Sequence, residues 1–309
     1  MNTIDELKKP NMYRENIYSL LKKTGKEPEA LLVPKNSGIR PYCETVLSEA
    51  GMDIGNPGIR VEFYRAEDIP AIIDQSFRKG RFLAGLTGDD LFDEYKMRNP
   101  SNLLALTNTY DWYEENAMFK RPALCLIGKG ELPEKPRVAV NRKYKQTSRI
   151  CLSKDFEDFD VQLYSGDTEN TVANGLNDCC VEIVFSGETL ASLGLQVIKK
   201  YRFSDLALIS PLYGGALFGE LMMREYDTIR NRKMFPKLGS QTSKDFEDPE
   251  RITRKLNEEA YEVVVEFLGG QRIVPELADL AFRAMEALIG KDATLDDLAL
   301  EILSRQKCT

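Results

Sequence analysis

The chain has 309 residues, of which 42% are apolar and 29% charged, and its formal net charge is −7. This negative charge argues against nucleic acid and anionic membranes as bulk partners. The chain contains no histidine, which excludes Ser-His-Asp and Cys-His hydrolases. No apolar run approaches the ~20 residues that cross a bilayer. The six cysteines lack CxxC spacing, so we expect a cytoplasmic protein with reduced thiols.

The first 27 residues are charged and predict a helical N-terminal extension. From residue 28 on, short apolar runs alternate with helical patterns, which indicates an α/β domain with parallel strand pairing. The series opens with the strands ALLVP, RVEFYRA and RFLAGLTG and continues through RPALCLIGKG, PRVAVNRKY, RICLSKDF, DVQLYSG, CCVEIVF and SDLALIS. A helix, ALFGELMMREYDTIRNRK, follows.

The pattern changes near residue 235. The segment PKLGSQTSKDFEDPER is polar with Gly and Pro, which is typical of a linker or a lid. The segments after it are helical, with acids clustered on their faces. We therefore predict a separate all-α domain over 235–309.

One strand leads into a turn that is rich in hydroxyls and backbone amides. CCVEIVF runs into Ser186-Gly187-Glu188-Thr189 and then into a helix. Such a turn directs several amides toward one point at a helix N-terminus, which suits a phosphate monoester. Glu182, within the strand, is placed to accept hydrogen bonds from ribose hydroxyls. The alternative is a simple helix cap.

The surrounding stretch, GLNDCCVEIVFSGETLASLGL, resembles the phosphoribosyl-diphosphate motif of ATP phosphoribosyltransferase, the first enzyme of histidine biosynthesis. Further likenesses follow in family order over about residues 30–210. They are LLVPK, RAEDIPAIID, AGLTGDDLFDE, RVAVNRKY and SGDTEN.

The resemblance implies a two-lobed α/β catalytic domain over 28–234 that is similar to periplasmic binding proteins. Lobe one would be about 28–120 with 205–234, lobe two about 121–204, and the active site would lie in the cleft. The implied catalytic residues are Glu182, Glu169 and Lys35. The implied substrate-binding residues are Ser186, Gly187, Glu188, Thr189, Leu190, Thr87, Gly88 and Arg40.

Several features bear on the transferase site. The family uses N1 of ATP, a nitrogen that needs little deprotonation, so the lack of histidine does no harm. Glu182 stands where the family motif has aspartate, and the Pro-Lys loop is PKNSGIRP instead of Pro-Lys-Gly-Arg. Arg142 and Lys143 are either a solvated pair or phosphate contacts. The departures at Glu182 and in the Pro-Lys loop leave the acceptor base open.

Four acids mark a second site. Glu259 and Glu262 are three residues apart on one predicted helix, and Glu276 and Asp279 repeat that spacing on the next. Packed together, the four carboxylates would repel one another unless a divalent cation neutralised them. Oxygen ligands of this kind favour Mg²⁺ or Mn²⁺. The alternative is that they are solvent-facing acids on amphipathic helices.

The pattern Glu-Glu-x-x-Glu followed by Glu-x-x-Asp resembles the all-α nucleotide pyrophosphohydrolases, which include phosphoribosyl-ATP pyrophosphatase and MazG-like proteins. The resemblance covers about residues 237–307. It implies Mg²⁺ held by Glu259, Glu262, Glu276 and Asp279, with Glu258 as a further acid beside the site. Hydrolysis between the α and β phosphates would release pyrophosphate.

Together, the two resemblances imply consecutive reactions. Phosphoribosyl diphosphate and ATP would give phosphoribosyl-ATP, and its hydrolysis would give phosphoribosyl-AMP. One alternative keeps both chemistries in a specialised pathway with a different acceptor base. Another is a nucleotide-sensing or solute-binding protein without turnover. Both families form oligomers, so we expect at least a homodimer, with neither nucleic acid nor membrane as a partner.

Overall fold

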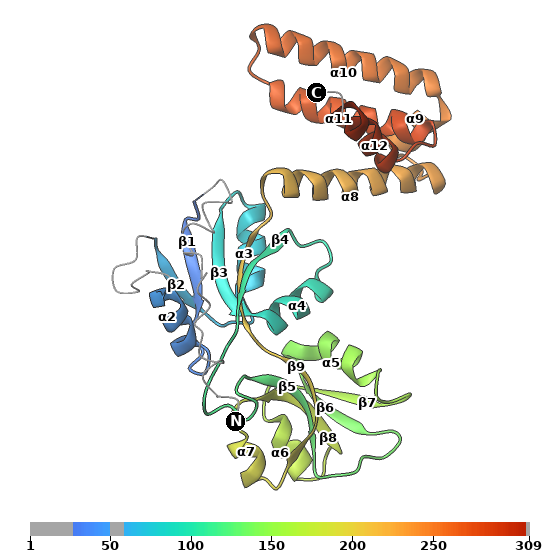
Figure 1. The fold of residues 1–309 in the computed structure, drawn as a ribbon. Coiled ribbons are helices and arrows are strands. Elements are labelled where there is room, and N and C mark those ends of the chain that lie inside the picture. Colours follow the sequence, from blue (N-terminus) through green and yellow to red (C-terminus); the bar gives the residue numbers. More distant parts are fainter. Residues whose placement is uncertain (1–26, 50–58, 307–309) are drawn as a thin grey trace. The chain divides into compact units, whose positions relative to one another are not determined.

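The computed structural model describes residues 27–49 and 59–306. The chain divides into two units, Met1–Gly214 and Gly215–Thr309. The first unit contains two five-stranded mixed sheets, which we call lobe one and lobe two, and the second is helical over its described part (Figure 1). This confirms the predicted two-lobed α/β domain followed by a helical region.

Lobe one has the strand order β2-β1-β3-β10-β4. β1 pairs in parallel with β2 and β3, whereas β10 is antiparallel to β3 and β4. Its strands are β1 (Ala30–Pro34), β2 (Val61–Tyr64), β3 (Leu83–Gly88), β4 (Leu104–Tyr110) and β10 (Leu206–Pro211). Its helices are α2 (Arg40–Glu49), α3 (Ile69–Arg78) and α4 (Asp89–Arg98).

Lobe two repeats this arrangement in the order β7-β6-β8-β5-β9. β6 is parallel to β7 and β8, and β5 is antiparallel to β8 and β9. Its strands are β5 (Ala123–Gly128), β6 (Arg137–Asn141), β7 (Asp160–Tyr164), β8 (Cys179–Val184) and β9 (Gln196–Phe203). Its helices are η2 (Arg142–Tyr144), α5 (Lys145–Leu152), α6 (Thr168–Ala173) and α7 (Glu188–Ser192). The chain crosses between the lobes after β4 and again after β9.

The central strands carry apolar residues on both faces because helices cover both sides of each sheet. In β1, all five residues are buried. Leu31 and Val33 belong to one core cluster and Ala30 and Leu32 to another, as expected from the alternation of side chains along a strand. The uninterrupted apolar run ALLVP therefore predicts a buried strand correctly.

The two lobes are joined by a buried carboxylate as well as by the crossing segments. Glu94 of α4 is 2% exposed. It accepts hydrogen bonds from the backbone N–H groups of Gln146 and Thr147 at 2.9 Å each, and from Thr147 Oγ1 at 3.0 Å. A lobe-one carboxylate thus caps the first turn of a lobe-two helix, α5, where negative charge is favoured.

The second unit consists of α8 (Gly214–Met234), α9 (Gln241–Glu247), α10 (Pro249–Gly269), α11 (Ile273–Gly290) and α12 (Leu295–Gln306). Its core contains Tyr226 and Ile229 of α8 with Met285 and Ile289 of α11. Asp248 caps α10 by accepting hydrogen bonds from two backbone N–H groups of its first turn.

The division of the chain differs from the predicted boundary near residue 235. The segment 215–234 is helical, as predicted, but it lies in the helical unit and not in lobe one. The physical reason is that Tyr226 and Ile229 bury their side chains against α11. In the sequence, the polar, glycine-containing segment after residue 235 is the more conspicuous break. Its composition predicts a linker or a lid, but Gln241–Glu247 within it form α9, whose Asp245 is buried against Arg283.

Two predictions concern residues outside the described ranges. The helical N-terminal extension is predicted over 1–27, of which the structure describes only Glu27. Cys308 also lies outside, while the five other cysteines are free thiols. No helix within 27–49 or 59–306 combines the length and apolar character needed to cross a bilayer.

Candidate active sites

The turn after β8 has the backbone conformation that its glycine allows. Gly187 precedes α7 with φ of +80°, in the left-handed region that favours glycine. A Cβ at this position would clash with Cε of Met118, and the backbone N–H of Met118 donates to the carbonyl of Phe185 at 2.7 Å. The segment between the lobes therefore packs directly on this turn. Glu188 and Thr189 are exposed, whereas the side chain of Leu190 is buried in the core of lobe two.

Glu182 lies on β8 within a network of hydrogen bonds. Its carboxylate accepts from Asn141 Nδ2 at 3.0 Å and from Thr168 Oγ1 at 3.4 Å. Thr168 also lies 3.2 Å from a carboxylate oxygen of Glu169, so the structure brings the two predicted catalytic acids together. Burial raises the pKa of Glu182, while Lys143 and the Asn141 hydrogen bond act in the opposite direction.

The predicted residues of lobe one have different surroundings. Lys35 is exposed directly after β1. Thr87 is fully buried, and its hydroxyl donates to the carbonyl of Ala66 at 2.7 Å. Arg40 is paired with Glu44 on its own helix at 2.8 Å and lies over the ring of Phe63. The side chain of Thr87 therefore supports the backbone, and that of Arg40 is already engaged on α2.

A cavity of about 250 Å³ lies between the lobes and includes Gly88 in its lining. Asp90 also lines it, is 1% exposed and accepts a hydrogen bond from Ser204 Oγ at 2.8 Å. Asp90 is not among the predicted site residues, although its position in the Gly-Asp-Asp sequence at the end of the strand β3 could have indicated that it lies near the cleft. Trp112 forms part of the same wall and stacks on Tyr42.

The acids of the helical unit converge in part. Glu259 and Glu262 of α10 and Glu276 of α11 each offer an oxygen within 4.8 Å of the others. Partial desolvation raises the pKa of Glu262, as do the Glu276 hydrogen bond and the charge of Glu259. Asp279 is exposed and outside this group of three. Glu258 is also exposed, 3.9 Å from Lys255.

A buried ion-pair cluster lies beside the carboxylate group. Arg283 of α11 reaches Glu259 at 3.8 Å, and it also contacts Asp245 at 3.0 Å and Glu286 at 2.6 Å. The side chains of Asp245 and Glu286 are at most 1% exposed. Glu259 is thus held by a cation on one side while facing Glu262 and Glu276 on the other.

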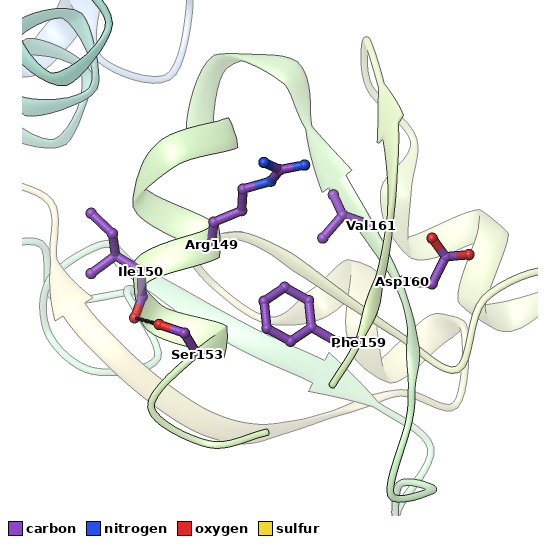
Figure 2. Close-up of a pocket in the computed structure, with 6 residues that line it drawn as sticks. All are labelled: Arg149, Ile150, Ser153, Phe159, Asp160 and Val161. Atoms are coloured by element: carbon purple, nitrogen blue, oxygen red, sulfur yellow. Dashed lines mark hydrogen bonds between the residues drawn. The ribbon is translucent and has the colours of Figure 1, made fainter. Parts of the chain in front are cut away.

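A larger hollow of about 530 Å³ lies beside β7, the edge strand of lobe two. It is lined by Arg149, Ile150, Ser153, Phe159, Asp160 and Val161, with Ser153 Oγ donating to the carbonyl of Ile150 (Figure 2). None of the predicted site residues is among these, so the hollow is separate from the sites described above.

Comparison with known proteins identifies both parts of the chain. The family model for HisG, ATP phosphoribosyltransferase, matches residues 65–213. Phosphoribosyl-ATP pyrophosphatase of Methanosphaera stadtmanae is 37% identical over 91 residues, which are 28% of this chain and 95% of that relative. The chain belongs to the phosphoribosyl-ATP pyrophosphatase family. It is an enzyme chain with an ATP phosphoribosyltransferase domain at residues 65–213.

Two further similarities are partial. The histidine biosynthesis bifunctional protein HisIE of Caldanaerobacter subterraneus is 36% identical over 91 residues, and the chain spans only 44% of its length. An ATP phosphoribosyl transferase (HisG:HisZ) complex from Thermotoga maritima superposes with a TM-score of 0.45 and 19% identity. That alignment covers 59% of this chain and 86% of the other.

The ATP phosphoribosyltransferase match includes some of the predicted site residues and not others. Thr87, Glu169, Glu182 and the turn at Gly187 fall within residues 65–213. Lys35 and Arg40, like the Pro-Lys loop to which they belong, precede the matched range. Their roles are therefore supported only by the sequence resemblance and by their position at the end of β1 and the start of α2.

Proposed function

We propose that this chain transfers phosphoribosyl from phosphoribosyl diphosphate to N1 of ATP and then hydrolyses the product to phosphoribosyl-AMP and pyrophosphate. The observation that carries the proposal is the presence of both halves in one chain. An ATP phosphoribosyltransferase match and a phosphoribosyl-ATP pyrophosphatase similarity occur together. Hydrolysis of the product would draw a reversible transfer forward.

In the transferase, the turn after β8 would hold the 5′-phosphate. The backbone amides of Ser186, Glu188 and Thr189 and the hydroxyls of Ser186 and Thr189 would supply donors, and the left-handed conformation of Gly187 sets the shape of the turn. Leu190 contributes packing through its buried side chain. The backbone amides and the hydroxyls of the turn would therefore bind the phosphate, while Leu190 anchors the turn in the core.

Departure of pyrophosphate would leave positive charge at C1 of the ribose, which nearby carboxylates stabilise. Glu182 and Glu169, linked through Thr168, are the carboxylates that the structure brings together. Asn141 and Lys143 favour the charged form of Glu182. Lys35, exposed at the end of β1, would add positive charge for the departing pyrophosphate. N1 of adenine attacks as a neutral nitrogen, so no general base is required.

The helical unit fits a magnesium-dependent hydrolase. The oxygens of Glu259, Glu262 and Glu276 lie within 4.8 Å of one another, and an oxygen-only donor set suits Mg²⁺. These three residues would hold the ion, with Asp279 and Glu258 at its margin. When bound, Mg²⁺ supplies charge neutralisation for the phosphates and polarisation of water. Arg283 would keep Glu259 oriented toward the site.

One observation favours a second candidate, in which the same chemistry acts on another acceptor base. Arg40, predicted to bind substrate, is paired with Glu44 and lies over Phe63. If Arg40 does not reach the ligand, the Pro-Lys loop of this chain differs in function from that of the family. A screen of nucleotides as acceptors distinguishes the two candidates.

The hydrolytic half is tested by supplying phosphoribosyl-ATP directly, with Mg²⁺, and measuring released pyrophosphate. We expect Glu262→Gln to lower the rate roughly 100-fold, in line with the loss of an essential ligand or its support. Glu250→Gln is the matched control because Glu250 is an exposed acid on the same helix. Equal rates for both variants would place the hydrolytic site elsewhere.

A further inference from the structure

A second cavity between the lobes, of about 430 Å³, contains cations from both of them. Arg98 comes from the last turn of α4 in lobe one, and Arg142 and Lys143 begin η2 in lobe two. Glu67 and Asp68, which precede α3, belong to the same lining. Cationic side chains from two lobes thus face one space.

These three cations form no ion pair within the part of the protein that the structure describes, although burial raises the pKa of Glu182 and the charge of Lys143, from beyond ion-pair distance, acts to lower it. No carboxylate of the described residues lies within 4 Å of the charged groups of Arg98, Arg142 or Lys143, even though two acids share their cavity. Arg202, by contrast, contacts Asp89 and Asp93 at 2.7 Å each. Arginines without a partner in a concave site are suited to phosphate, which their planar donor groups bind with two parallel hydrogen bonds.

The cationic cavity adjoins the apolar one described above. Lys143 and Glu67 line both, so the two share a wall. The smaller cavity adds Trp112, Ile183 and Phe185 as apolar surface. An apolar pocket that opens beside a cluster of unpaired cations matches a ligand with a flat apolar base and a charged phosphate tail.

We propose that Arg98, Arg142 and Lys143 bind the polyphosphate chain of the acceptor nucleotide, which makes them specificity residues for a triphosphate over a monophosphate. The assignment rests on the proposed function in that the acceptor is a nucleotide. Because the cations come from α4 and η2, a bound polyphosphate bridges the two lobes. Glu67 and Asp68 lie on the lobe-one side, where the cation that accompanies a polyphosphate is accommodated.

The experiment measures binding directly, by titrating the full chain calorimetrically with inorganic tripolyphosphate, ATP and AMP at fixed Mg²⁺. Arg98→Gln and Arg142→Gln are each expected to weaken tripolyphosphate and ATP binding about tenfold or more, since each removes a charge-assisted hydrogen-bond donor. AMP lacks the β and γ phosphates, so we expect its binding to change less than about threefold. Lys96→Gln is the control, because it removes one positive charge from the same helical turn outside the cavity.

The outcomes separate this proposal from the proposed function. Unchanged tripolyphosphate binding in both arginine variants overturns the polyphosphate site, as does an equal loss in Lys96→Gln. If the wild type forms no phosphoribosyl-ATP but the arginine variants still lose tripolyphosphate binding, the site stands and the acceptor assignment fails. Thermal unfolding of each variant confirms that the loss is not one of folding.

Discussion

The cap that Glu94 provides to α5 predicts a large stability loss from a small substitution. In the wild type, the N–H groups of Gln146 and Thr147 each lie 2.9 Å from an oxygen of the Glu94 carboxylate. In Glu94→Gln, one of these oxygens becomes an amide NH₂, which cannot accept a hydrogen bond. The change removes at least one hydrogen bond to a charged group, worth about 1.5–3 kcal/mol. It also removes the favourable charge at a helix N-terminus, worth up to about 2 kcal/mol when partly buried. We expect a loss of about 3 kcal/mol in the free energy of unfolding of the two-lobed unit.

Urea unfolding followed by the fluorescence of Trp112 measures this loss. Trp112 is the only tryptophan and is 7% exposed in the two-lobed unit, so its signal reports on that unit. For a unit of this size, 3 kcal/mol corresponds to a fall in Tm of roughly 6–12 °C. Glu134→Gln, at an exposed acid, should stay within about 0.5 kcal/mol of the wild type. A loss below about 1 kcal/mol in Glu94→Gln would refute the assigned role of the cap.

Two further predictions concern the same unit. Gly187→Ala forces a left-handed conformation on a residue whose Cβ would meet Met118. We expect the variant to be about 1–2 kcal/mol less stable and to have a raised KM for phosphoribosyl diphosphate. An unchanged KM would show that the turn does not bind this substrate. Burial, outweighing the charge of Arg202, raises the pKa of Asp89 from 3.8 to about 6. In the unfolded chain Asp89 keeps its ordinary pKa, so it loses its proton at a lower pH than in the folded protein. Its contribution to the stability of the fold is therefore full below about pH 4 and is lost as the pH rises through 6. We expect urea unfolding at pH 4.5, 5.5 and 7 to show that the free energy of unfolding falls less steeply with pH in Asp89→Asn than in the wild type. The same pH dependence in both proteins would contradict this assignment.

Most of the segments predicted as strands are strands, and the uninterrupted apolar runs are the clearest of them. The segment RICLSKDF, placed in the same series, begins instead in the helix α5. ALLVP coincides with β1, and SDLALIS contains β10. The strands β4 and β9 were not predicted, because LALTNTY and QVIKKYRF mix polar and apolar residues. Both are edge strands, which bury less surface, but edge position alone is not the reason because the edge strands β2 and β7 are predicted from RVEFYRA and DVQLYSG.

The candidate sites show a similar limit. The strand-to-helix turn at Gly187 is predictable because its residues are adjacent in sequence and its conformation is local. Helical spacing brings Glu259 and Glu262 to one face, but it does not determine which acids of the next helix complete the group. Packing of α10 on α11 selects Glu276 and leaves Asp279 exposed. The cationic cavity depends on contact between the lobes: the sequence offers Arg142 and Lys143 as possible phosphate contacts, but nothing in it places Arg98 beside them.

The central claim is that one chain carries out both reactions in order. Its most direct test is incubation of the full chain with Mg²⁺, ATP and phosphoribosyl diphosphate, with products followed by mass spectrometry and Glu262→Gln run in parallel. We predict phosphoribosyl-AMP from the wild type and accumulated phosphoribosyl-ATP from the variant. Consumption of neither substrate by the wild type, or phosphoribosyl-AMP from both proteins at equal rates, would contradict the account.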